Sequence, residues 1–224
     1  MENRTPKILT KADIKLGDVL LCYPVPKPVS VDKIISEAIR HYTNSAYTHA
    51  ALSVDNEEVV EAVKEGVHKI ALETLLDKYE HIAVFRSQSG FWTETRADSL
   101  KTFVMQLIGQ KTKYNVLDLK NFVTGKKETH FETLSEQLAD YFDGNSLLPN
   151  LPDRAQYFCS EFVVSCFIKV GIIDEVASVQ YRPNVYAPSD LAKDPTFGLC
   201  IGYLSKHDNY QVLESDEFYY DALG

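Results

Sequence analysis

The sequence predicts an α+β protein built around a mostly antiparallel β-sheet. Short apolar or alternating segments, typical of strands, fill the first half and middle of the chain, while stretches with helical apolar spacing lie towards both ends. Two of the strand-like segments flank the turn residues Asp55–Asn56 at close spacing. This pattern indicates a β-hairpin, which makes its two strands antiparallel.

The first half of the chain supplies most of the predicted strands. In IKLGDVLLCYPV, a turn at Gly17–Asp18 precedes an apolar strand that prolines end. Residues Ser30–Thr43 place apolar side chains on one helical stripe, behind a serine that can cap the helix. Tyr47–Val54 and Glu57–Val63 are the arms of the hairpin. GVHKIAL and HIAVFRS are further strands, separated by a short helix near Glu73–Lys78.

The rest of the chain contains longer helices. Thr93–Ile108 carries an apolar stripe, and Cys159–Val170 is an apolar helix that Gly171 ends. Between them the pattern weakens, and we interpret Gly109–Gln156 as a helical or loop insertion, or lid, within one domain spanning residues 1–224. RPNVYAPSDLAKD is turn-rich, FGLCIGYLS is a last strand, and the acidic tail ESDEFYYDALG is expected to be peripheral.

Charge and composition exclude several classes of partner. The formal net charge of −9 argues against general nucleic-acid binding, which needs a cationic surface, and against electrostatic binding to anionic membranes. The N-terminal segment has no apolar core typical of a secretory signal, and no apolar run is long enough to span a bilayer. We therefore expect a cytoplasmic protein without a membrane span.

The four cysteines form no CxxC pair and fit no zinc spacing, so we expect reduced thiols and no metal or other cofactor. Cys22, Cys166 and Cys200 lie within apolar segments and are predicted to be inert core residues. Cys159 differs because it begins a predicted helix. Unpaired N–H groups and the helix dipole at that position stabilise a thiolate and can bind an oxyanion.

His49, in the strand YTHAAL, is the candidate general base, and Glu61 on the return strand is the candidate orienting residue. If the hairpin connection is the three-residue loop Val54–Asn56, His49 falls opposite Glu61 on the same face. A two-residue loop, Asp55–Asn56, would place His49 opposite Ala62 and put Glu61 on the other face. A slip of one residue flips every side chain, so the sequence leaves both registers open.

The segments LGDVLL, YTHAALSV, VVEAV…GV and YFCSEFVV, in that order, resemble the YiiX/YebB-like branch of the permuted NlpC-type papain-like cysteine peptidases and amidases. The resemblance covers residues 16–86 and 157–204. It implies a circularly permuted papain-like fold, with the central sheet packed against the helix that bears the nucleophile. By this resemblance Cys159 is the nucleophile, His49 the general base, Glu61 the orienting residue, and Tyr157 a residue whose hydroxyl lies near the oxyanion.

The predicted function is therefore a cysteine hydrolase that cleaves an amide or related acyl bond of a small substrate through a thioester. Two alternatives stay open. The first is a lipid acyltransferase or phospholipase of the lecithin–retinol acyltransferase type, which would need an apolar groove built from the insertion. The second is a non-catalytic binding module that retains the fold, in which Cys159 has an ordinary thiol pKa.

Overall fold

The computed structural model describes residues 5–25, 45–63, 65–110, 113–114, 156–157, 159–174, 181, 186–207 and 209–223. The helix expected at Ser30–Thr43 lies outside these residues. So does most of the insertion expected at Gly109–Gln156, and with it the apolar groove of the acyltransferase alternative. The prediction of a single domain with a lid therefore stays a prediction.

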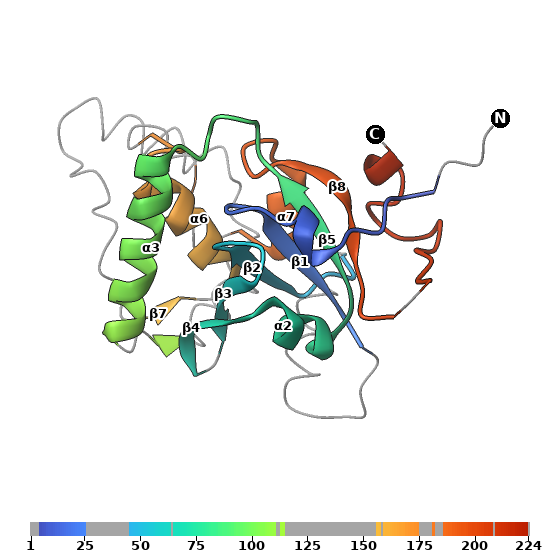
Figure 1. Cartoon of the computed structure of the whole chain (residues 1–224), viewed down its shortest axis with the longest axis horizontal. Coiled ribbons are helices and arrows are strands. Elements are labelled where there is room, and N and C mark those ends of the chain that lie inside the picture. Colours follow the sequence, from blue (N-terminus) through green and yellow to red (C-terminus); the bar gives the residue numbers. More distant parts are fainter. Residues whose placement is uncertain are drawn as a thin grey trace, which may run out of the picture.

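The described residues form an α+β structure, as predicted. Six strands make one antiparallel sheet in the order β4-β3-β2-β1-β5-β8, and a separate two-stranded parallel pair joins β6 to β7 (Figure 1). The strands are β1 (Val19–Pro24), β2 (His49–Ser53), β3 (Glu58–Val63), β4 (Gly66–Ala71), β5 (Tyr79–Arg86), β6 (Lys113–Tyr114), β7 (Gln156–Tyr157) and β8 (Leu199–Leu204). The described helices are α2 (Leu72–Lys78), α3 (Glu94–Gly109), α6 (Cys159–Lys169) and α7 (Pro188–Lys193), with 3₁₀ turns η1 (Lys11–Asp13) and η4 (Asp221–Leu223).

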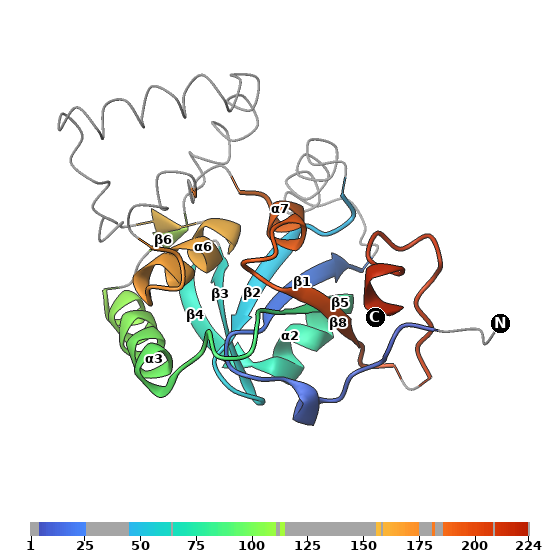
Figure 2. The same ribbon diagram turned by 90° about the horizontal axis from the view of Figure 1, so that it is seen from above.

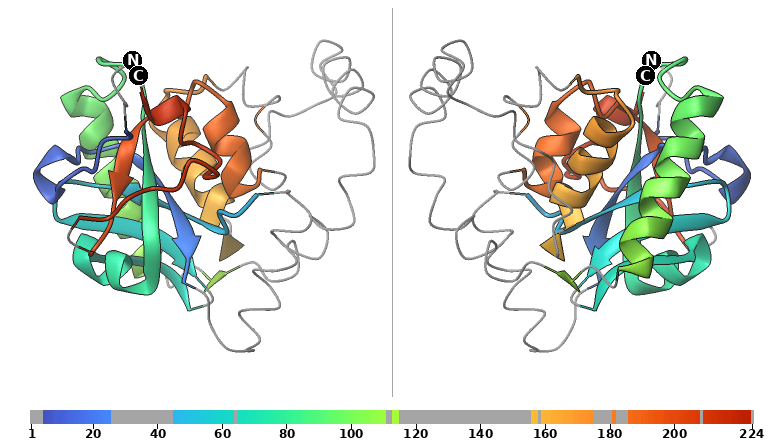
Figure 3. Two further views of the ribbon diagram at one scale, coloured as in Figure 1. Left: turned by 90° about the vertical axis from the view of Figure 1, so that its right-hand side faces the viewer. Right: turned by 90° about the vertical axis from the view of Figure 1, so that its left-hand side faces the viewer.

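Both faces of the sheet are covered, which explains why its central strands are apolar rather than alternating. On β1, Val19 and Leu21 belong to the core shared with α3 and α6, whereas Leu20 and Cys22 belong to the core shared with α2. Figures 2 and 3 show α2 on one side of the sheet and α6 and α7 on the other. The sheet therefore separates two cores, and residues near strand ends can reach groups on either side.

The predicted turn at Gly17–Asp18 is present and fixes the start of β1. Gly17 has a φ of 86°, and a Cβ there would meet the Trp92 ring, so both the backbone and the space favour glycine. Asp18 is buried and accepts two hydrogen bonds from Arg86, from Nε at 2.8 Å and from a terminal guanidinium nitrogen at 2.6 Å. This bidentate pair ties the turn to the end of β5.

The β2–β3 hairpin follows neither of the two predicted registers. Ala51 pairs with Glu61 and Ser53 with Val59, which is two residues beyond the register of a three-residue loop. The connection is longer because Asp55 Oδ1 accepts hydrogen bonds from the backbone N–H groups of Glu57 and Glu58, closing an Asx turn. An even-numbered shift keeps the side chains on their faces, so His49 and Glu61 still lie on the same side of the sheet.

Two expectations for the C-terminal third are wrong. The segment predicted to be turn-rich contains α7, which begins with Pro188 and in which Asp190 accepts a hydrogen bond from the Ala187 N–H. The tail expected to be peripheral is packed into the core, with Phe218 and Tyr219 buried. The Phe218 ring lies on Tyr47 and Phe85, so the tail covers the α6-side core at one end of the sheet.

Candidate active site

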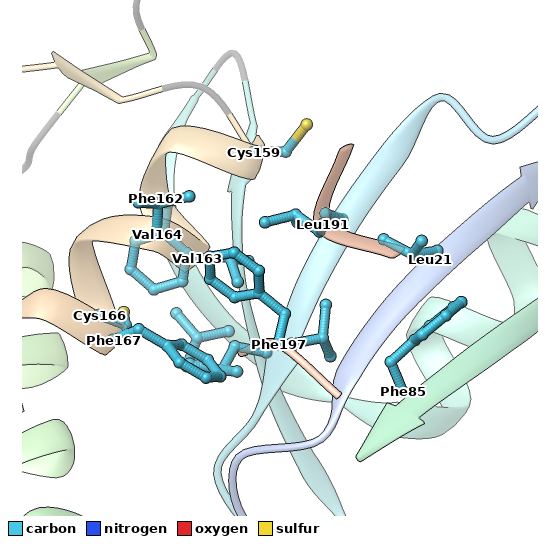
Figure 4. Packing of buried hydrophobic residues seen from close by; sticks show 14 of the residues in the cluster. Leu21, Phe85, Cys159, Phe162, Val163, Val164, Cys166, Phe167, Leu191 and Phe197 are labelled. Carbon is cyan, nitrogen blue, oxygen red and sulfur yellow. The ribbon is translucent and has the colours of Figure 1, made fainter. Parts of the chain in front are cut away.

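Cys159 is the first residue of α6, where the sequence placed it. Figure 4 shows its sulfur pointing away from the apolar side chains of the helix, whereas Cys166, two turns later, lies among them. The Cys159 Sγ is held by the His49 side chain and by the backbone N–H groups of Ala50 and Ser160. The helix terminus and the start of β2 thus meet at the sulfur.

These contacts lower the pKa of the Cys159 thiol below its ordinary value. Burial, with 3% of the residue exposed, acts in the opposite direction because it disfavours the thiolate. The hydrogen bond from His49, the positive charge of its ring and the two backbone N–H groups outweigh burial. The arrangement therefore favours a thiolate facing an imidazolium.

His49 is the first residue of β2 and is nearly buried. Its Nε2 atom lies 2.9 Å from Glu61 Oε2, which leaves Nδ1 for Cys159. Burial alone would lower the pKa of His49, but the hydrogen bonds and negative charges of Cys159 and Glu61 raise it to about 9. The ring therefore carries its proton at neutral pH.

In the residues just before His49, the side chains do not alternate strictly between the two faces of the sheet. Tyr47 belongs to the core on the α6 side, whereas Ala51 belongs to the core on the α2 side, although alternation would place both on one face. Tyr47 precedes the first residue of β2, so the pleat does not constrain it. His49 stands at this change of face, with Glu61 on the α2 side and Cys159 on the helix of the other side.

Glu61 is buried in the middle of β3, with 2% of its side chain exposed. Lys78, the last residue of α2, lies 2.6 Å from its second oxygen, Oε1. Burial raises the pKa of Glu61, but the hydrogen bonds and charges of His49 and Lys78 lower it to about 2. A buried carboxylate is thus kept ionised between two cationic partners.

Sequence reasoning missed Lys78 and its neighbour Tyr79. The Tyr79 ring stacks on the His49 ring, with centroids 5.7 Å apart and planes 6° from parallel. A lysine at the end of the predicted helix is a common capping pattern, so the local sequence gives no sign of its partner. Only the pairing of β3 with β4, followed by the return through α2, brings these residues to the site.

Tyr157 lies in β7, where its backbone pairs with Tyr114. Its side chain lies outside the described part of the structure, so a hydroxyl near the oxyanion stays a prediction. Cys22, Cys166 and Cys200 are free and buried, as expected of core residues. Burial raises the pKa of each, that of Cys200 to about 12.

Within the described ranges, no three or more His, Cys, Asp and Glu side chains are grouped so as to hold a metal ion. Nor does any helix in this part of the chain have both the length and the apolar composition needed to cross a bilayer. The groups that do converge are a thiol, an imidazole, a carboxylate and helix N–H groups. This set can carry out nucleophilic acyl transfer without an added cofactor.

Comparison with known proteins gives a distant likeness. The chain is 23% identical over 171 residues to a protein of Escherichia coli (strain K12) named "Probable lipoprotein peptidase YaeF", an alignment that covers 74% of this chain. The same alignment spans 59% of the length of that protein. No protein-family model matches the chain. The cytoplasmic location expected for this chain stays a prediction.

Proposed function

We propose that this protein is a cysteine hydrolase that cleaves an amide bond of a small, peptide-like substrate through a thioester. The observation that carries the proposal is the contact of one imidazole, His49, with both the Cys159 thiol and the buried Glu61 carboxylate. The likeness to a protein named a peptidase points to the same class of reaction.

In the proposed reaction, the Cys159 thiolate attacks the carbonyl carbon of the amide. Negative charge moves to the carbonyl oxygen, where the backbone N–H at the start of α6 stabilises it. The C–N bond then breaks as the His49 imidazolium gives its proton to the departing nitrogen. The products of this step are a free amine and a thioester on Cys159.

Water completes the cycle. Neutral His49 takes a proton from a water molecule, which attacks the thioester carbonyl. The C–S bond breaks, the acid product leaves, and the thiolate–imidazolium pair forms again. Glu61 holds the ring through Nε2 and stabilises its positive charge in both steps. Its pKa of about 2 keeps it ionised throughout the neutral range.

The decisive test is the rate of Cys159 alkylation by iodoacetamide as a function of pH, in the wild type and in His49→Ala. Cys159 of the wild type should react at pH values well below about 8.5, which is the ordinary pKa of a free thiol. His49→Ala should move the rise in rate to higher pH. A wild-type alkylation rate that stays low up to about pH 8.5 and does not change in His49→Ala would favour the non-catalytic binding module.

The substrate class is tested separately. The wild type and Cys159→Ala are incubated with a library of short peptides and, in parallel, with phosphatidylcholine vesicles. We expect amine release from peptides in the wild type alone. Fatty-acid release from the vesicles, without peptide cleavage, would replace the peptidase proposal with the lipid acyltransferase alternative.

A further inference from the structure

We propose that Lys78 and Tyr79, at the junction of α2 and β5, are positioning residues that hold Glu61 and His49 in the geometry that activates Cys159. This inference rests on the proposed function and extends it to two residues that act through Glu61 and His49. We call these two consecutive residues the brace.

The first half of the brace acts on the carboxylate. The two oxygens of Glu61 are divided between partners, Oε2 to His49 at 2.9 Å and Oε1 to Lys78 at 2.6 Å. A carboxylate held at one oxygen can still turn about its last side-chain bond. A second partner at the other oxygen removes that freedom and fixes the direction in which Oε2 faces the ring.

Because Glu61 is buried, Lys78 also helps to keep its carboxylate ionised. Only 2% of the Glu61 side chain is exposed, and an ionised carboxylate buried there costs free energy unless charged or hydrogen-bonding groups compensate. His49 supplies one such group. Lys78 supplies a positive charge, and 42% of its side chain remains exposed, so its own desolvation is partial.

The second half of the brace acts on the imidazole. The nearly parallel Tyr79 ring limits tilting of the His49 plane, while the Glu61 hydrogen bond limits rotation within that plane. Together they leave Nδ1 facing Cys159. This is the support that a general base needs if it is to meet its nucleophile without reorganising.

The junction itself is firmly held. Leu72 and Leu75 of α2 are fully buried against the sheet, and Leu76 is nearly so. The Tyr79 N–H caps the helix by donating to the Leu76 carbonyl, and the next strand, β5, runs antiparallel along β1. Lys78 also lies at the helix end where a cation is favoured.

A second lysine–glutamate pair, between β3 and β4, provides a matched control. Lys69 lies 2.8 Å from Glu58, with 39% and 43% of the two side chains exposed. The two lysines are therefore exposed to a similar extent, but of the two only Lys78 faces a buried carboxylate. An exposed pair contributes little to either stability or pKa, so Lys69 should have no influence on Cys159.

The experiment measures the pH dependence of Cys159 alkylation by iodoacetamide in Lys78→Met, Lys78→Arg and Lys69→Met. Without Lys78, Glu61 takes up a proton at higher pH, and His49 then loses the anion that stabilises its charged form. In Lys78→Met the acid limb of the rate profile should move up by about one pH unit, so that the rate at a given pH on that limb falls roughly tenfold. Lys78→Arg should restore the wild-type profile, and Lys69→Met should match it.

A double-mutant cycle separates action through Glu61 from any other effect. In a Glu61→Gln background, Lys78→Met should change the alkylation rate by less than about twofold, because the lysine no longer has a carboxylate to hold. An undiminished effect of Lys78→Met in that background would overturn the inference. So would a Lys78→Met profile equal to the wild type. If Lys78→Met does not fold, Lys78→Gln replaces it, with the same expectations.

The outcomes for the brace and for the proposed function are distinct. If the wild-type thiol reacts only above about pH 8.5 and ignores His49, the proposed function fails and the brace fails with it. If the wild-type alkylation rate shows a lowered thiol pKa that depends on His49 but is unchanged in Lys78→Met, only the role proposed for the brace is wrong.

Discussion

The Nε2 atom of His49 lies 2.9 Å from Oε2 of Glu61, although the two residues are not directly opposite each other in the β2–β3 pair. Ala51 occupies the position opposite Glu61, so His49 is a diagonal neighbour on the same face. Diagonal positions are about 7–8 Å apart, a separation that two long side chains can bridge. The imidazole therefore meets the carboxylate while its other nitrogen is left for Cys159.

Brief treatment with iodoacetamide at pH 7 should modify Cys159 and spare the other three cysteines. Cys200 is the informative control because it is slightly more exposed than Cys159, 7% against 3%, while its pKa is raised to about 12. Peptide mapping by mass spectrometry gives the order of labelling. Labelling of Cys200 before Cys159 would show that exposure, not ionisation, governs reactivity.

The pKa of His49 should fall when Cys159 is replaced by alanine. The hydrogen bond and charge of the thiolate help to raise the pKa of the ring to about 9, and their removal leaves burial, which acts downward, opposed by Glu61 alone. Titration of the His49 ring by NMR in the wild type and Cys159→Ala measures the change. An unchanged His49 pKa would mean that the two side chains do not interact in solution.

Tyr79→Leu should slow Cys159 alkylation at neutral pH, while Tyr79→Phe should leave it within about twofold of the wild type. The phenylalanine ring can keep the stacking on His49, whereas leucine offers no flat surface. We expect a loss of roughly 3–10-fold for leucine, corresponding to an aromatic contact of about 0.7–1.4 kcal/mol. Equal losses in both variants would assign the effect to the tyrosine hydroxyl instead.

The C-terminal tail should contribute to stability. Phe218→Ala removes a buried ring packed on Tyr47 and Phe85 and should lower the free energy of unfolding by about 3–4 kcal/mol. Tyr220, two residues later, is 70% exposed, so Tyr220→Ala should change it by less than about 0.5 kcal/mol. Urea denaturation of both variants makes the comparison. Similarly small changes in the free energy of unfolding for both variants would indicate that the tail does not contribute to the core.

Asp216 should make the stability of the protein pH-dependent at the acid end. Its carboxylate accepts hydrogen bonds from the Tyr47 and Tyr203 hydroxyl groups and lies 3.2 Å from His81 Nε2. Burial raises the pKa of Asp216, but the contacts with His81 and Tyr203 and the Phe218 N–H outweigh it and lower the pKa below its ordinary value. Stability from this group is therefore present above the unfolded-state pKa of about 3.9 and is lost as the pH falls.

Asp216→Asn should accordingly lower the free energy of unfolding by about 2–3 kcal/mol at pH 7. The difference from the wild type should shrink below about pH 4, where the wild-type carboxylate also becomes protonated. Urea denaturation midpoints of both proteins, measured from about pH 3 to about pH 7, give this difference as a function of pH. The range includes the ordinary carboxyl pKa of about 3.9. A difference that is constant over this range would show that the charge of Asp216 is not what stabilises the fold.

Local patterns were sufficient for most of the elements. Apolar spacing predicted the strands β1 and β3 and the helices α3 and α6, because burial on one or both faces imposes a period on the chain. The hairpin loop was misjudged because an Asx turn at Asp55 extends it. The tail was misjudged because its few aromatic residues, among many acidic ones, give no periodic signal.

Two features of the site follow from local patterns alone: Cys159 begins an apolar helix, and His49 and Glu61 lie in the two arms of one hairpin. The other features exist only in the folded chain: the register that makes His49 and Glu61 diagonal neighbours, the contact of Cys159 with Ala50, and the ion pair of Lys78 with Glu61. The physical reason is that periodicity reports only whether a side chain is buried. Which groups share that burial depends on strand order and on the packing of helices from elsewhere in the chain.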